Sequence, residues 1–149
     1  MPRFARADGR LDLAKELTLQ AEDKVPGSGV LTPHFSPGAT LSVRDAIRLM
    51  IAYSDNTATN LVVDQIGLPT TAELMAGMGF PETRLHAKVF RGDTSIAPAR
   101  SKTFELGSTT AVDMIRLLER LQKGEVVGPE ASREMLEHLR ACDDKDRLS

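Results

Sequence analysis

A serine, a carboxylate and an amide stand in consecutive positions at Ser54, Asp55 and Asn56, directly after Tyr53. Acyl transfer by a serine enzyme needs an activated nucleophile, a proton shuttle and donors for the developing oxyanion, and side chains of these types can serve such roles. The same three residue types also occur together in ordinary helix–helix turns, where Asp accepts backbone N–H groups. The triplet therefore indicates chemistry only if its surroundings do.

Helical patterns lie on both sides of this turn. Ser42 and Asp45 have the spacing of a capping box, which predicts a helix that begins at Val43. Apolar residues then recur with the helical period, and after the turn a second apolar stretch runs to a stop at Gly67. We therefore expect residues 53–56 to join two buried helices and to hold their polar groups toward a cleft.

Ser54-Asp55-Asn56 matches the S-D-N element of class A serine β-lactamases and the related penicillin-binding proteins. The chain resembles this family from about residue 10 onward. The matching segments are PGSGVL at 26–31, PGATLSVRD at 37–45, SDNTATNL at 54–61 and GSTT at 107–110.

The resemblance implies roles for the residues of the turn. Ser54 would pass a proton toward the leaving nitrogen and contact the substrate carboxylate. Asn56 would bind the nucleophile-side lysine and the amide side chain of the substrate. Tyr53 would join them in substrate binding, whereas Asp55 would be structural and would fix the turn through backbone N–H groups. The implied substrate is a β-lactam or a peptidoglycan-like peptide.

A second match lies at residues 91–97, RGDTSIA, which follow the R-x-E-x-x-L-N pattern of the family's Ω-loop with departures. Asp93 stands where a glutamate activates the deacylating water, and Ala97 stands where an asparagine helps to hold that water. Because Asp is one methylene shorter, its carboxylate would fall about 1 Å short, which can cost on the order of 10²-fold in rate. Arg91 would anchor the loop by pairing with a carboxylate. An ordinary solvated turn is the alternative, and Glu105 is a rival carboxylate.

Two motifs of the family are absent from the sequence. No serine begins S-x-x-K, and residues 102–104 lack the glycine of K-T-G. The chain thus resembles the helical part of the family fold, cut from between the nucleophile and the C-terminal strands. We expect a single helical domain over residues 1–149 that is inactive on its own.

The remaining patterns predict an all-α fold of about five helices and no strand. A third helix should begin at Pro69, and two more should follow residue 107. Residues 1–9 are expected to be disordered, and residues 11–25 to form a short helix or an extended loop. Residues 80–107 show no sustained period, which predicts a long loop, either functional or misassigned.

The composition excludes several partner classes. The chain of 149 residues has a net charge of −2, so it has no basic excess for nucleic acid. No apolar run reaches the length of a membrane span. Residues 1–3 lack the apolar core of a signal peptide, so we expect that the chain as written is not exported, although the resemblance implies a periplasmic or secreted family.

The scattered reactive residues indicate no further site. Cys142 is the single cysteine, so no intrachain disulfide can form. Glu134 and His138 have a metal-like spacing, but no third ligand is evident, and His86 has no sequence neighbours that indicate a site. We expect no metal and no cofactor.

Two functions from different classes remain open. The first is a fragment of a serine hydrolase, and the second is a non-catalytic helical module used for folding or association. Because apolar faces made to pack against absent elements must still be covered, we expect a homodimer or larger assembly. Exchange of the C-terminal helices through residues 80–107 is the expected route.

Overall fold

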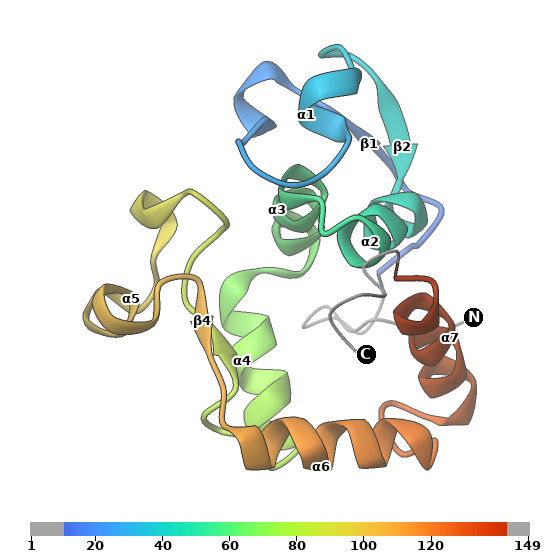
Figure 1. Cartoon of the computed structure of the whole chain (residues 1–149), viewed down its shortest axis with the longest axis vertical. Coiled ribbons are helices and arrows are strands. Elements are labelled where there is room, and N and C mark those ends of the chain that lie inside the picture. The colour runs from blue at the N-terminus through green and yellow to red at the C-terminus, as the bar shows by residue number, and fades with distance from the viewer. Residues whose placement is uncertain (1–10, 143–149) are drawn as a thin grey trace.

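The computed structural model describes residues 11–142, and it is mostly helical (Figure 1). The expectation of disorder at residues 1–9 lies outside the described residues. The helices are α1 (Leu31–His34), α2 (Val43–Ala52), α3 (Asn56–Ile66), α4 (Leu68–Gly77), α5 (Pro98–Phe104), α6 (Ala111–Gln122) and α7 (Pro129–Arg140). The described residues therefore contain seven α-helices. The prediction of about five was too low because α1 is only four residues long and α5 lies in residues 80–107, which we expected to be a loop.

Four short strands correct the prediction that the chain has none. β1 (Glu16–Thr18) pairs antiparallel with β2 (Thr40–Ser42), and β3 (Arg84–Leu85) pairs antiparallel with β4 (Gly107–Ser108). In β1 only the middle residue, Leu17, is buried, which is the alternation expected of a strand with one face on a core. The strands have two or three residues each, too few for a periodic pattern to reveal them in the sequence.

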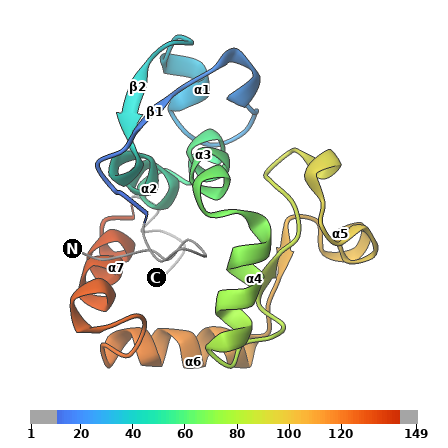
Figure 2. The ribbon, with the colours of Figure 1, turned by 180° about the vertical axis from the view of Figure 1, so that it is seen from behind.

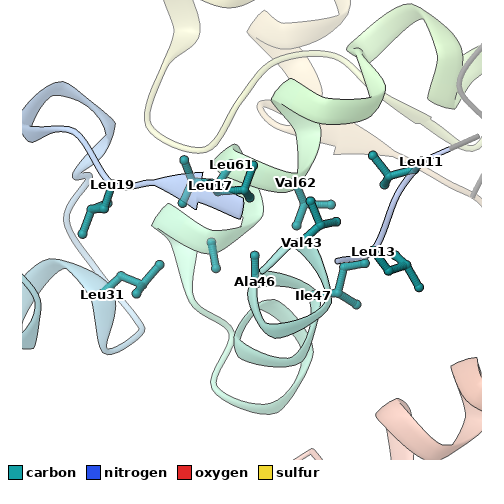
Figure 3. Packing of buried hydrophobic residues seen from close by; sticks show 11 residues of the cluster. Leu11, Leu13, Leu17, Leu19, Leu31, Val43, Ala46, Ile47, Leu61 and Val62 are labelled. Atoms are coloured by element: carbon teal, nitrogen blue, oxygen red, sulfur yellow. The ribbon is translucent and has the colours of Figure 1, made fainter. Parts of the chain in front are cut away.

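The core lies where α2 and α3 pack together next to the β1–β2 strand pair (Figure 3). Ser42 is the N-cap as predicted: its Oγ accepts the Asp45 N–H at 3.0 Å, and α2 begins at Val43. The Asp45 carboxylate accepts the Ser42 hydroxyl at 2.7 Å, a bond that differs from the reciprocal backbone bond of a full capping box. α3 ends at Ile66, and Gly67 adopts a positive φ of 83° that terminates the helix. The buried side chains of this core are Leu11, Leu13, Leu17, Leu19, Leu31, Val43, Ala46, Ile47, Ala58, Leu61 and Val62.

Residues 80–107 are more ordered than predicted. Besides β3 and β4, this segment contains a 3₁₀ turn at Gly92–Thr94 and helix α5. The backbone of His86 joins two other parts of this segment. The His86 N–H donates to Leu106 O at 2.8 Å, and the His86 carbonyl accepts the Ile96 N–H at 2.9 Å. Two stretches of the segment are therefore fastened to one residue, and the long structureless loop is not observed.

The C-terminal helices extend the molecule away from the β1–β2 strand pair. α6 runs along the end opposite these strands, and α7 returns from it to pack on α2 (Figures 1 and 2). An ion pair of 2.5 Å between Arg44 and Glu134 fastens α7 to α2. Val112, Ile115 and Leu118 of α6 are half exposed or more, so its apolar stripe lacks a packing partner within residues 11–142. Each helix in the described part of the chain is too short or too polar to span a bilayer.

Candidate functional site

The turn at residues 53–56 joins the two core helices directly. α2 ends at Ala52, and the Leu49 carbonyl accepts the N–H groups of both Tyr53 and Asp55, at 3.1 and 3.2 Å. Ser54 has a φ of 50°, in the left-handed region that a non-glycine residue rarely adopts. The left-handed residue reverses the chain sharply, which leaves the side chains of Tyr53 and Ser54 exposed at the surface.

Asp55 holds this turn from inside the protein. Its side chain is buried, with 1% of the residue exposed. One carboxylate oxygen accepts the N–H groups of Val30 and Leu31 at 2.6 and 2.9 Å, and the other accepts the Ala58 N–H at 2.9 Å. Asp55 is therefore the N-cap of α3 and at the same time the anchor of the loop that precedes α1.

The loop at residues 26–29 lies against the turn. Asn56 makes two hydrogen bonds to this loop: its backbone N–H donates to Ser28 O at 3.1 Å, and its side-chain Nδ2 donates to Pro26 O at 3.0 Å. A Cβ atom at Gly29 would lie 2.3 Å from Asp55 Cγ, and one at Gly27 would lie 2.5 Å from Asn56 Nδ2. The approach is possible only because both positions are glycine, which explains physically why the PGSG run accompanies the triplet.

Asn60 positions a segment next to the turn, and the sequence reasoning missed it. It lies one helical turn after Asn56 and is almost fully buried. Its Nδ2 donates to Val89 O at 3.0 Å, and its Oδ1 accepts the Val89 N–H at 2.8 Å, so one amide binds both polar atoms of one backbone residue. Next to this clamp, Lys88 Nζ contacts both carboxylate oxygens of Asp64 at 2.8 Å. A polar amide within the apolar stretch of α3 was the available signal.

Arg91 and Asp93 pair with each other. Arg91 Nε and Nη2 each donate to one carboxylate oxygen of Asp93 at 3.1 Å, and both side chains are well exposed. The hydrogen bonds from the guanidinium lower the pKa of Asp93 and raise the pKa of Arg91. Within residues 11–142 no hydrogen bond joins Asp93 to the turn at 53–56, and Ala97 lies at the N-cap of α5.

His86 has neighbours that the sequence did not indicate. Its Nε2 lies 3.0 Å from Ser108 Oγ, which also contacts Arg100 Nη2 at 3.0 Å and the Glu82 carbonyl at 3.2 Å. Because Arg100 only donates and the carbonyl only accepts, the Ser108 hydroxyl gives its proton to Glu82 and accepts one from His86 Nε2–H. Burial, and then the charges of Arg100 and Arg84, lower the pKa of His86. The hydroxyl proton is thus directed away from the imidazole, and the pair is a structural junction rather than a nucleophile and its base.

Glu134 and His138 belong to the contact between helices. Glu134 binds Arg44, and His138 Nε2 lies 3.8 Å from the same carboxylate. Among the described residues, no group of three or more His, Cys, Asp or Glu side chains is arranged to hold a metal ion.

The chain is similar to known proteins along nearly all of its length. A model of the Beta-lactamase enzyme family matches residues 4–149. The β-lactamase of Sphaerobacter thermophilus DSM 20745 is 30% identical, with a TM-score of 0.76 over 90% of this chain and 48% of that one. A β-lactamase from Xanthomonas campestris pv. campestris str. ATCC 33913 is 23% identical, with a TM-score of 0.73 over 91% of this chain and 48% of that one.

A protein named PBP-A has the same fold. Its L158E mutant, described as an acyl-enzyme complex with penicillin G, is 22% identical, with a TM-score of 0.73 over 89% of this chain and 46% of that one. No sequence among the curated proteins matches. The chain spans about half the length of the solved structures that it resembles.

Proposed function

Since the chain belongs to the Beta-lactamase enzyme family, we propose that it is the helical lobe of an acyl-serine enzyme that acts on β-lactams or on peptidoglycan-like peptides. The observation that carries the proposal is the rigid presentation of Ser54 and Asn56. A buried carboxylate and a glycine loop hold the turn between two packed helices. Fixed polar groups at an exposed turn are what orientation of a substrate requires.

Each side chain of the turn has a role in this proposal. Ser54 passes a proton to the leaving nitrogen, and Tyr53 and Asn56 contact the substrate beside it. One N–H of the Asn56 side chain is used by Pro26 O, which fixes the amide plane. Within the described residues the Asn56 Oδ1 accepts no hydrogen bond, so it is free to bind a donor of the substrate or of an activating lysine.

The nucleophile of the proposed reaction comes from outside these 149 residues, because none of their serines begins S-x-x-K. We therefore expect the isolated chain to show no β-lactam hydrolysis. Ser54 is exposed, and among the described residues no basic side chain is hydrogen-bonded to its hydroxyl, so we expect it to react as an ordinary alcohol. A chromogenic cephalosporin assay, with intact-mass spectrometry after incubation with penicillin, checks this expectation. Turnover or a stoichiometric adduct that disappears in Ser54→Ala would contradict it.

A chimera tests the proposal positively. The segment of the S. thermophilus β-lactamase that matches this chain is replaced by residues 11–142, which include the core side chains Leu11 and Leu13, so that the remaining half supplies the nucleophile. We expect β-lactam acylation by the chimera, and Ser54→Ala should lower its rate by about 10²-fold, as loss of a proton shuttle does. Ser36→Ala, at an exposed serine after α1, is the matched control and should leave the rate unchanged. A folded chimera that acylates equally well with Ser54→Ala would refute the role of Ser54.

The Ω-loop match bears on the second half of the reaction. Asp93 is proposed as the base for the hydrolytic water, but it would first have to leave Arg91, which stabilises its charged form. We therefore propose that the acyl-enzyme is long-lived, as in a penicillin-binding protein. The Asp93→Asn variant of the chimera tests this role. If Asp93 is the base, its replacement lowers the deacylation rate; if Asp93 only forms a surface ion pair, the deacylation rate does not change.

The uncovered face of α6 supports association as a second candidate function. Val112, Ile115 and Leu118 form an exposed apolar stripe that a second copy of the chain would cover. Burial of a few hundred Å² is worth several kcal/mol at about 25 cal/mol per Å², before the entropy of association is subtracted. We expect a homodimer in sedimentation velocity across a dilution series, and Ile115→Glu should shift it to monomer. A wild-type monomer at high micromolar concentration would exclude this assembly.

A further inference from the structure

Phe90 is an exposed aromatic residue beside Asn56. Its ring is directed to the outside, with 64% of the residue exposed. Two ring atoms, Cε2 and Cζ, lie 3.2 and 3.6 Å from the point where a Gly27 side chain would begin, and Asn56 Nδ2 lies 2.5 Å from the same point. The ring edge and the amide are therefore neighbours at the surface, and both can approach residue 27 this closely only because it is glycine.

Hydrogen bonds to the neighbouring backbone hold the turn that carries Phe90. Asn60 binds both polar atoms of Val89, the residue immediately before it, and the Arg91 N–H donates to Lys88 O at 3.1 Å across a tight turn. Phe90 itself has a φ of 55°, a strained conformation for an aromatic residue. The turn is thus clamped on one side and hydrogen-bonded across, and Phe90 projects from its apex.

Two residues on one face of α3 determine the positions of the Asn56 amide and the Phe90 ring. Asn56 and Asn60 are four residues apart on this helix, so they lie on the same face. The first is the amide of the proposed site, and the second fixes the turn that carries Phe90. Their relative positions are therefore determined by a rigid helix rather than by a mobile loop.

We propose that Phe90 contacts the acyl side chain of the substrate and favours β-lactams whose acyl group carries an aromatic ring. An exposed ring edge prefers an aromatic partner in offset or edge-to-face contact, and it adjoins the amide that would bind the acyl amide of the same substrate. This assignment rests on the proposed function, because it requires substrate to bind at Ser54 and Asn56.

Two penicillins that share the bicycle and the acyl amide test the assignment. One carries a phenylacetyl group and the other a propionyl group, and each is titrated into the isotopically labelled chain while amide shifts of residues 54–61 are followed. We expect the phenylacetyl compound to bind about three- to tenfold more tightly. Phe90→Ala should abolish this preference and Phe90→Tyr should retain it. Phe35 is an exposed aromatic residue that lines a different pocket with Leu19 and Arg48. Phe35→Ala is therefore the matched control and should leave the preference for the phenylacetyl compound unchanged.

The outcomes separate this assignment from the proposed function. If both penicillins shift residues 54–61 with equal affinity, or if Phe90→Ala keeps the preference, the role of Phe90 is refuted while substrate binding stands. If neither compound shifts these amides, the proposed function fails and the assignment fails with it. Circular dichroism of each variant verifies that the helices are intact.

Discussion

Replacement of Asp55 by alanine should lower the free energy of unfolding by about 3–5 kcal/mol, because it leaves buried backbone donors without acceptors. Three N–H groups, from Val30, Leu31 and Ala58, end on this one buried carboxylate. Each unsatisfied buried donor costs about 1–3 kcal/mol, and the helix also loses its N-cap. Urea denaturation followed by circular dichroism measures the change.

A matched carboxylate provides the control for Asp55. Asp93 is exposed and has Arg91 as its partner, so Asp93→Ala should leave the urea midpoint close to that of the wild type. Asp55→Asn keeps one acceptor oxygen and should fall between the two. A loss of under about 1 kcal/mol in Asp55→Ala would show that water or a rearranged loop satisfies the three donors.

Replacement of Gly29 by alanine should destabilise the protein by a similar amount, about 3–5 kcal/mol, for a steric reason. The new methyl group would lie 2.3 Å from Asp55 Cγ and 2.6 Å from Asp55 Cα, and the second of these atoms belongs to the backbone. Gly29 also has a φ of 117°, which an L-residue rarely adopts. Overpacking and backbone strain therefore act together. Urea denaturation of the variant measures the loss.

The chain offers two glycines that separate these causes. Gly38 has a φ of 92° but no atom within 4 Å of its missing side chain, so Gly38→Ala should show the strain alone, about 1–2 kcal/mol. Gly92 has neither feature, and Gly92→Ala should be close to neutral. In the Asp55→Ala background the cost of Gly29→Ala should shrink, since part of the clash is gone. Equal losses at positions 29 and 38 would mean that the close approach to Asp55 is unimportant.

The central helices were predictable from the sequence because their signals are local. Ser42 and Asp45 define the start of α2 within four residues, and Gly67 supplies the stop of α3. The S-D-N triplet placed the turn between them for the same reason. Caps, stops and apolar period all act over distances that a single sequence displays.

The rest depends on contacts between distant segments. β1 and β2 pair across a separation of more than twenty residues, and α5 is a short helix with an N-cap, Ala97, that makes no side-chain hydrogen bond. Nothing local to Asn60 indicates that it binds Val89, and nothing local to His86 indicates Ser108. Tertiary hydrogen bonds of this kind are fixed by the fold rather than by spacing.

The hydrogen bonds that hold residues 86–89 limit which sequence changes in the following turn would affect the site. His86 is tied to Leu106 and Ile96, and Val89 is tied to Asn60, so the stretch that reaches α3 is secured at both ends. The 3₁₀ turn at Gly92–Thr94 follows this stretch: Gly92 and Asp93 are exposed, and Thr94 Oγ1 accepts the Lys88 N–H at 2.9 Å. A change in length at that tip would leave the Asn60–Val89 contact in place but would displace Asp93, the proposed base for the hydrolytic water. Variation at the tip would therefore alter the lifetime of an acyl-enzyme more than the geometry of the turn at residues 53–56.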